Sequence, residues 1–180
     1  MSKTHWPANF SGVFEEPTVA ETQSGDVLIN MRMANDQQRC GGTHCRFGAI
    51  STDGGASFSP ATPIPSLISS GCQGSLLFHP LSESILFSNP RNARGRVNGT
   101  LSLSTDNGDS WGIVRTIDPG TFAYSCLSLL PVTRSDGTAL DAGVNSSHVG
   151  VLYEGHSGLL LFARPSVKAS SDTHTLRDGN

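Results

Sequence analysis

One eight-residue pattern occurs twice in this chain and limits its fold more than any other sequence feature. The copies begin at Ser51 and Ser104, 53 residues apart, and both follow S-x-D-x-G-x-x-[FW]. An Asp side chain can cap the N–H groups of a tight turn, Gly can supply a positive φ, and an aromatic residue can hold the turn against strands. Two copies at a spacing that accommodates four short strands predict the blade repeat of a β-propeller.

We therefore expect the positions that define the pattern to be structural in both copies. Composition agrees with an all-β fold, because Gly is 20 and Pro 10 of 180 residues and only 15% of residues are charged. No stretch of 15 residues keeps helical periodicity with good helix formers. The structural positions are Ser51, Asp53, Gly55 and Phe58 in the first copy and Ser104, Asp106, Gly108 and Trp111 in the second.

Short alternating or apolar runs, bounded by Gly, Pro, Asn or Asp, predict the strands themselves. They are 26–33, 74–79, 84–88, 96–103, 125–130, 149–153 and 159–162. A blade of about 50 residues leaves room for three to three and a half blades. An ordinary single globular domain is the alternative. We expect residues 1–167 to be the C-terminal half of a longer propeller, with open ends that need a partner half, and 168–180 to be a disordered tail.

The cysteines leave several arrangements open. Cys40 and Cys45 flank His44 in a Cys-x4-Cys segment, which could form a metal clip, a disulfide or two buried thiols, whereas Cys72 and Cys126 stand alone. The clip lacks an evident fourth ligand, so disulfide pairing or buried thiols are favoured. We expect no metal and no cofactor.

Three N-glycosylation acceptors, at Asn9, Asn98 and Asn145, favour the secretory route. Residues 1–10 lack the apolar core of a signal peptide, and no apolar run is long enough to cross a membrane. A glycan on Asn98 would be close to Arg96, so that acceptor is unused or the strand bends there.

Charge argues against nucleic acid and for local anion binding. The net charge is −3, so no general basic field exists, yet Arg outnumbers Lys ten to two. A guanidinium matches a carboxylate bidentately, so clustered arginines indicate an anionic ligand, although a single Arg is most often a solvated surface charge.

Four segments, in order and interleaved with the two repeats, resemble the sialidase family, most closely its animal lysosomal type. They are EPTVAE with VLINMR (16–21 and 27–32), FSNP with RVNGTL (87–90 and 96–101), FAYSCL (122–127) and VLYE (151–154). The repeats themselves resemble the Asp-box of that family, where the motif is structural. The resemblance implies a six-bladed β-propeller and an exo-α-sialidase, which releases terminal sialic acid from glycoproteins, oligosaccharides or glycolipids.

The resemblance also implies site roles. Tyr124 would be the nucleophile, the known exception to the two-carboxylate rule of glycosidases, and Glu16 would be its base. Arg32 and Arg96 would bind the substrate carboxylate. Glu154 would support the first arginine of the family's triad from outside the reacting atoms. We expect these side chains near the propeller axis and the Asp-box turns on the outer rim.

Each role has a structural alternative. Tyr124 could be a half-buried strand aromatic, and Glu154 a structural carboxylate. Glu16 competes with Glu15 and Glu21, and is preferred for its 16-residue lead over Arg32. Arg96 competes with Arg91 and Arg94 and is preferred because an alternating run follows it directly, as at a strand end.

The family's first arginine, in its usual Phe-Arg-Ile-Pro context, and its aspartate acid/base have no counterpart in residues 1–180. General acid catalysis contributes about 10²–10⁴-fold, so the chain alone is expected to be nearly inactive. From another function class, the alternative is a non-catalytic Asp-box propeller that binds glycans or proteins. Trans-sialidase activity would use the same residues as hydrolysis.

Overall fold

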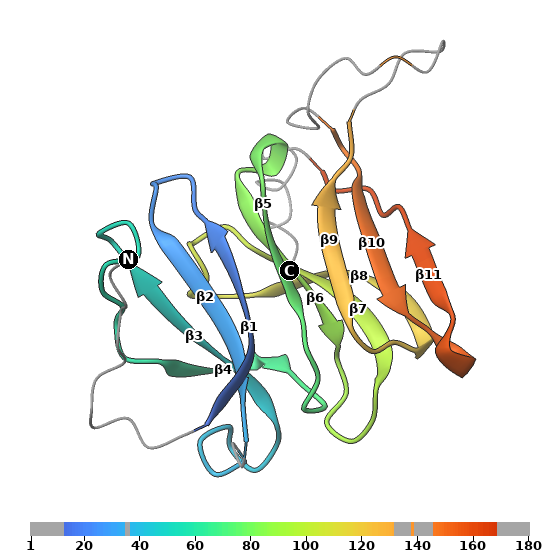
Figure 1. Ribbon diagram of the computed structural model, residues 1–180, viewed down its shortest axis with the longest axis horizontal. Coiled ribbons are helices and arrows are strands. Elements are labelled where there is room, and N and C mark those ends of the chain that lie inside the picture. Colours follow the sequence, from blue (N-terminus) through green and yellow to red (C-terminus); the bar gives the residue numbers. More distant parts are fainter. Residues whose placement is uncertain (1–12, 35–36, 132–137, 139–145, 169–180) are drawn as a thin grey trace, which may run out of the picture.

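The computed structural model describes residues 13–34, 37–131, 138 and 146–168, which form three antiparallel sheets (Figure 1). We call the sheets blades 1, 2 and 3. Blade 1 contains β1 (Phe14–Glu21), β2 (Val27–Met33), β3 (Cys45–Ser51) and β4 (Thr62–Ile68). Blade 2 contains β5 (Ser75–His79), β6 (Ser84–Pro90), β7 (Val97–Ser104) and β8 (Gly112–Thr121). Blade 3 contains β9 (Ser125–Leu129), β10 (Val149–Glu154) and β11 (Leu160–Ala163).

The three blades are arranged side by side, with their first strands adjacent. Within each blade the strands pair in sequence order, and two single-turn helices, η1 (Pro80–Ser82) and η2 (His156–Gly158), lie in connections. The first strands of the blades contact one another, β1 against β5 and β5 against β9 (Figure 1). This arrangement is an arc of a β-propeller and confirms the predicted all-β propeller class. Blade 3 has three strands among the described residues, where four were expected.

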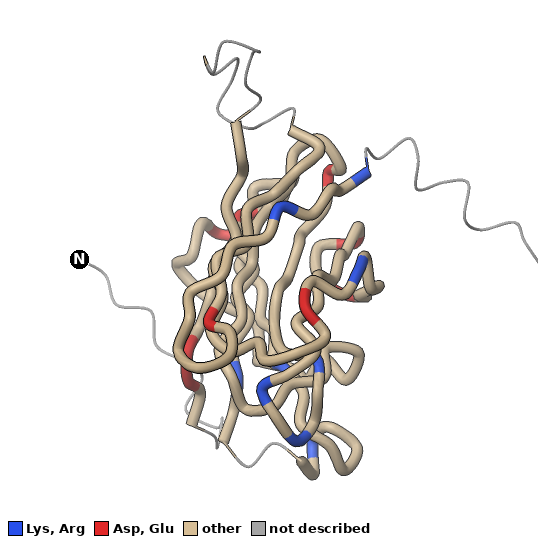
Figure 2. Tube along the Cα trace, turned by 90° about the vertical axis from the view of Figure 1, so that its right-hand side faces the viewer, with Lys and Arg blue, Asp and Glu red and all other residues tan. Residues whose placement is uncertain are grey.

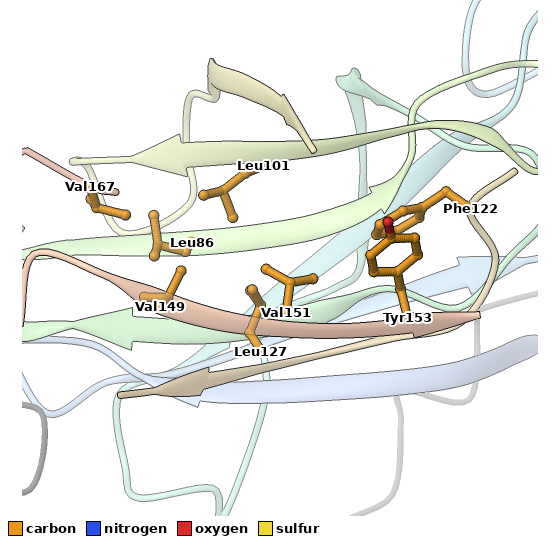
Figure 3. Packing of buried hydrophobic residues seen from close by; sticks show 8 residues of the cluster. All are labelled: Leu86, Leu101, Phe122, Leu127, Val149, Val151, Tyr153 and Val167. Atoms are coloured by element: carbon orange, nitrogen blue, oxygen red, sulfur yellow. The ribbon is translucent and has the colours of Figure 1, made fainter. Parts of the chain in front are cut away.

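The hydrophobic cores lie between the blades, so burial fixes how one blade sits on the next. Between blades 1 and 2, the core is built around Leu28, Leu67, Leu76, Ile85 and Phe87. Between blades 2 and 3, Figure 3 shows side chains from both sheets pointing into one layer. Burying each large apolar side chain contributes about 1.5–3 kcal/mol. The second layer consists of Leu86, Leu101, Phe122, Leu127, Val149, Val151, Tyr153 and Val167.

All seven predicted strand segments are strands, and four further strands were missed by the sequence analysis. β1, β4 and β8 each contain proline, which lowers strand propensity. β3 is buried on both faces from Cys45 to Ala49, so it has no apolar–polar alternation. β4 and β8 are the outer strands of their blades, where a missing N–H is tolerated.

Each Asp-box closes a turn with its own side chains. Ser57 N donates to Asp53 Oδ1 (2.8 Å), and Gly55 N donates to Ser51 Oγ (2.8 Å). Gly55 has φ +88°, in the left-handed region that favours glycine. Hydrogen bonds to Asp53 from the Ser57 hydroxyl, the Ser57 N–H and the Ser51 hydroxyl lower the pKa of Asp53 to about 2.

The second Asp-box repeats this geometry. Ser110 N donates to Asp106 Oδ1 (2.9 Å), Gly108 N donates to Ser104 Oγ (2.8 Å), and Gly108 has φ +96°. Burial pushes the pKa of Asp106 upward, but the combined hydrogen bonds from Ser110 and Ser104 outweigh it and lower the pKa. Both turns are therefore closed by hydrogen bonds among their own residues.

The aromatic residues of the two motifs pack differently. Phe58 contacts the cluster on the outer side of blade 1, whereas Trp111 contacts the core between blades 1 and 2. A Cβ at Gly108 would lie 2.8 Å from Leu28, so glycine also permits this second turn to contact blade 1. The second Asp-box thus helps to hold two blades together.

Cys40 and Cys45 form a disulfide, with their Cα atoms 5.6 Å apart, so the metal-clip alternative is wrong. Among the described residues, no group of three or more His, Cys, Asp or Glu side chains is arranged to hold a metal ion. Cys72 is a buried free thiol and Cys126 an exposed one.

Of the three glycosylation acceptors, Asn98 alone lies within the described residues. It has φ +60°, and its Nδ2 donates to Arg91 O (3.1 Å), so the strand bends at this position. Asn9, Asn145 and the predicted tail beyond Lys168 lie outside them. No helix in the described ranges is long and apolar enough to span a membrane.

Candidate active site

Tyr124, at the start of blade 3, and Glu16, in blade 1, are in direct contact. Tyr124 precedes β9 directly, Glu16 lies in β1, and both strands begin in the lower half of the molecule in Figure 1. The Tyr124 hydroxyl donates a hydrogen bond to Glu16 Oε1. This hydrogen bond, followed by burial and the negative charge of Glu16, raises the pKa of Tyr124. The phenol is therefore neutral and its proton already points at an acceptor.

The backbone at Glu16 is unusual for a strand. Glu16 has φ +48°, Pro17 follows it, and the register of β1 shifts between Glu15 and Thr18. A positive φ at a non-glycine residue costs about 1–3 kcal/mol and is retained where surrounding contacts require it. The bulge lets two consecutive carboxylates, those of Glu15 and Glu16, contact the same guanidinium of Arg32.

Arg32 is held on three sides. Its Nη2 lies 2.7 Å from Glu15 Oε2, and its Nη1 donates to Gly71 O (3.0 Å). Its Nε lies 2.7 Å from Glu16 Oε2, an ion-pair distance without hydrogen-bond alignment. Because its side chain is still 26% exposed, Arg32 is both oriented by the protein and accessible to an anion.

Arg96 lies beside Tyr124 from the blade 2 side. It directly precedes β7, and its Cζ lies 5.3 Å from the centroid of the Tyr124 ring. Its backbone carbonyl accepts a hydrogen bond from Phe122 N (2.9 Å). Arg96 is exposed, and no carboxylate of the described residues forms an ion pair with it. Its charge is therefore available to a ligand.

Glu154 contacts the backbone of Tyr124. Its Oε2 accepts from Tyr124 N (3.4 Å), and Glu154 N donates to Tyr124 O (2.9 Å). Ala123 N also donates to Glu154 O (2.9 Å). In the described structure Glu154 supports the tyrosine, which the sequence alone did not indicate. Glu154 was expected to support the first arginine of the family's triad, but no counterpart of that arginine was found in this sequence.

The structure thus brings Glu16, Arg32, Arg96 and Tyr124 together and separates them from the Asp-boxes. Arg96 precedes the start of β7 whereas Ser104 ends it, so the site and the second Asp-box lie at opposite ends of one strand. Figure 2 shows that most segments coloured for Lys and Arg lie in the lower half of the molecule, where β1, β7 and β9 begin.

The structure also shows where the alternatives to Glu16 and Arg96 lie. Glu15 is not an alternative to Glu16 but a second partner of Arg32. Glu21 lies at the far end of β1, and Arg94 is exposed and forms no ion pair within the described residues. Arg91 is half-buried in the turn before β7.

Several supporting residues were not predicted from the sequence, chiefly Arg46 and the segment 71–73. Arg46 is fully buried, donates from Nε to Asn30 Oδ1 (2.7 Å) and lies 5.5 Å from the Phe87 ring centroid. An arginine inside the apolar run of β3 was the available signal, because a buried cation requires partners.

An open pocket of about 320 Å³ lies beside Tyr124 on blade 3. It is lined by both polar and apolar side chains. Cys72, close to the same residues, is a neutral thiol because burial raises its pKa. The pocket residues include Gln73, Tyr124, Cys126, Leu152, Glu154 and Leu160.

The profile of the BNR repeat-like domain family matches residues 3–134. The chain belongs to this family. Over 156 residues it is 33% identical to a sialidase of Micromonospora viridifaciens, covering 82% of this chain and 21% of the relative. It is 28% identical to a sialidase of Bacteroides fragilis over 163 residues, covering 85% of this chain and 26% of the relative.

A solved structure has the same fold as this BNR repeat-like domain. The Hadza microbial sialidase Hz136 superposes with a TM-score of 0.64 at 25% identity, covering 85% of this chain and 27% of that one. The chain therefore spans about a quarter of the length of the relatives that it matches. The curated relatives are bacterial, so resemblance to the animal lysosomal type rests on the four sequence segments alone.

Proposed function

We propose that this chain carries the nucleophile side of an exo-α-sialidase site. The observation that supports this most is the Tyr124–Glu16 hydrogen bond with two arginines, Arg32 and Arg96, beside it. Sialic acid has a carboxylate on its anomeric carbon, so a site needs cations for this group and a nucleophile that tolerates it. Arg32 and Arg96 would supply the cations, and Tyr124 the nucleophile.

In the proposed reaction, the Tyr124 oxygen attacks the anomeric carbon while the bond to the aglycone oxygen breaks. The phenol proton passes to Glu16, and a glycosyl-tyrosine forms. Water then attacks the same carbon and gives a proton to the acid group, supplied by another blade, that protonated the aglycone; the bond to Tyr124 breaks, and the tyrosine recovers its proton from Glu16. Two inversions give net retention of configuration.

A neutral phenol suits this substrate. A carboxylate nucleophile would bring a second negative charge to the sugar carboxylate, whereas the raised pKa of Tyr124 keeps it uncharged until attack. Arg32 and Arg96 would bind the sugar carboxylate and offset its charge. Removal of the proton by Glu16 then generates the nucleophile only when the sugar is in place.

We further propose that additional blades supply the remaining groups, a third arginine and the acid that protonates the leaving oxygen. They would also cover the outer face of blade 3, where Leu152, Leu160 and Phe162 are exposed. Sialylated glycoproteins, oligosaccharides or glycolipids would be the substrates, as the sialidase relatives indicate in general terms.

Reaction with 2,3-difluorosialic acid tests this function in the chain itself. Fluoride leaves without protonation, so attack by Tyr124 displaces it even where no general acid is present, and the 3-fluoro group slows hydrolysis of the product. We expect one sugar per chain, bound to Tyr124 in peptide mass spectrometry. Tyr124→Phe is expected to abolish labelling and Glu16→Gln to slow it by about 10²-fold or more.

Other outcomes of this experiment are equally informative. Equal labelling of Tyr124→Phe, or attachment to another residue, would disprove the nucleophile assignment. Saturable binding of the sugar without any covalent product, by a chain with native circular dichroism, would favour the non-catalytic glycan-binding alternative.

A further inference from the structure

The segment that enters blade 2 contacts both arginine-bearing strands of blade 1. Gly71 O accepts from Arg32 Nη1 (3.0 Å), and Cys72 O accepts from Arg46 Nη1 (2.7 Å). Arg46 itself is fully buried. Two consecutive carbonyls of the segment are therefore fixed by two cations, one of which belongs to the candidate site.

The next residue, Gln73, reaches blade 3. Its Oε1 accepts a hydrogen bond from Ser125 N (2.9 Å), the amide that directly follows the nucleophile Tyr124. Ser125 is 6% exposed, so this N–H has little access to water. Because a buried N–H without an acceptor is destabilising, the Gln73 oxygen stabilises the start of β9 at this position.

The segment has little freedom to move. A Cβ at Gly74 would lie 2.3 Å from Phe87 Cζ, so the chain passes directly over that buried ring. After Gly74 it continues into β5, between β1 and β9. The carboxamide of Gln73 is thus presented from a backbone that is held at both ends.

Other contacts of the tyrosine segment are not equivalent to this one. The Tyr124 N–H contact with Glu154 Oε2 is longer, at 3.4 Å, and comes from blade 3 itself. The Ser125 hydroxyl pairs with Ser88 Oγ (2.8 Å) of blade 2, but it places a side chain and not the backbone. Gln73 links the backbone beside the nucleophile to the segment that anchors Arg32.

We propose that Gln73 is a positioning residue that sets the place of Tyr124 relative to Glu16 and Arg32. The catalytic part of this inference rests on the proposed function. Its geometric part does not, because the Gln73–Ser125 contact exists whatever the chain does. Loss of the Gln73 oxygen is therefore expected to slow attack by Tyr124 without weakening sugar binding.

Hydrogen exchange of the Ser125 amide tests the geometric part. We compare the native chain with three variants. Gln73→Leu removes the acceptor, and Gln73→Glu keeps a carboxyl oxygen in its place. Gln23→Leu changes an exposed glutamine on a distant turn of blade 1 and serves as the control. Exchange is expected to be about tenfold faster in Gln73→Leu and unchanged in the other two. Equal exchange in all four proteins would overturn the proposal.

The labelling reaction tests the catalytic part. With 2,3-difluorosialic acid, Gln73→Leu is expected to lower the maximal rate about tenfold and to keep the half-saturating concentration within about twofold, while Gln73→Glu restores most of the rate. A raised half-saturating concentration with an unchanged maximal rate would mark Gln73 as a sugar contact and overturn the proposal. If even the native chain is not labelled, the proposed function fails, and the Ser125 exchange still decides the geometric part.

Discussion

The two ends of blade 2 are built on different principles. At one end, the second Asp-box closes its turn with hydrogen bonds among residues 104–110, all consecutive in the chain. At the other end, the candidate site joins Glu16, Arg32, Arg96 and Tyr124, which come from three blades. The first arrangement depends on local sequence, whereas the second depends on how the blades pack.

The two ends also differ in backbone strain. The Asp-boxes have positive φ at glycines and, in the second copy, at Asn107, a residue type that tolerates this region, whereas the site places Glu16 there. Arg32 and Tyr124 hold the Glu16 carboxylate and so support this conformation. An Asp-box turn can therefore close with its own hydrogen bonds, whereas the site needs intact interfaces between blades.

The largest expected effect comes from breaking the interface near the site. Gly99→Ala places a Cβ 1.9 Å from the Phe122 ring, which is fully buried two residues before Tyr124. Overpacking of this kind costs about 1–3 kcal/mol, and the displaced ring moves the tyrosine segment. We expect lower stability in urea and at least tenfold slower labelling of Tyr124.

Gly112→Ala in the same blade is the matched control, because its Cβ would meet no atom within 4 Å. It is expected to leave both stability and labelling unchanged. A Gly99→Ala chain that labelled at the native rate would show that the blade interface does not set the position of Tyr124.

A smaller effect is expected at the Asp-box end. Asp106→Ala removes the acceptor for Ser110 N and for the Ser104 hydroxyl, a loss comparable to that of a helix cap, about 0.5–2 kcal/mol. Labelling of Tyr124 is expected to stay within about twofold of native, because the turn lies at the far end of β7. Asp109→Ala, in the same turn but outside the motif, controls for the lost charge and is expected to unfold like the native chain in urea titrations.

The smallest effect concerns acid stability. Asp53 has a pKa of about 2 in the folded chain against a reference value of 3.8, because Ser57 and Ser51 donate to its carboxylate. Its contribution to stability is therefore full above pH 3.8 and is lost as the pH falls toward about 2. Stability of native and Asp53→Asn chains, compared by urea unfolding from pH 5 to pH 2, should converge at the acid end. Parallel curves throughout that range would show that Asp53 is not selectively stabilised as a carboxylate.

The sequence alone was sufficient for the local features. Both Asp-boxes, the all-β class and seven strand segments follow from turn residues and side-chain periodicity, whose physical causes act over a few residues. The order of the four family-like segments also named the residues that the structure brings together, although their spacing says nothing of the distance between them.

Only the tertiary structure decided the rest. It placed Glu15 and Glu16 on one guanidinium through a bulge, made Glu154 a contact of Tyr124, and put Gln73 against the amide of Ser125. The last two contacts, like that of Tyr124 with Glu16, join residues at least 30 positions apart, and the bulge is retained because Arg32 and Tyr124 hold the Glu16 carboxylate. Local propensity therefore carries no information about them, and they arise when apolar faces between blades are buried and the strands can settle in one register.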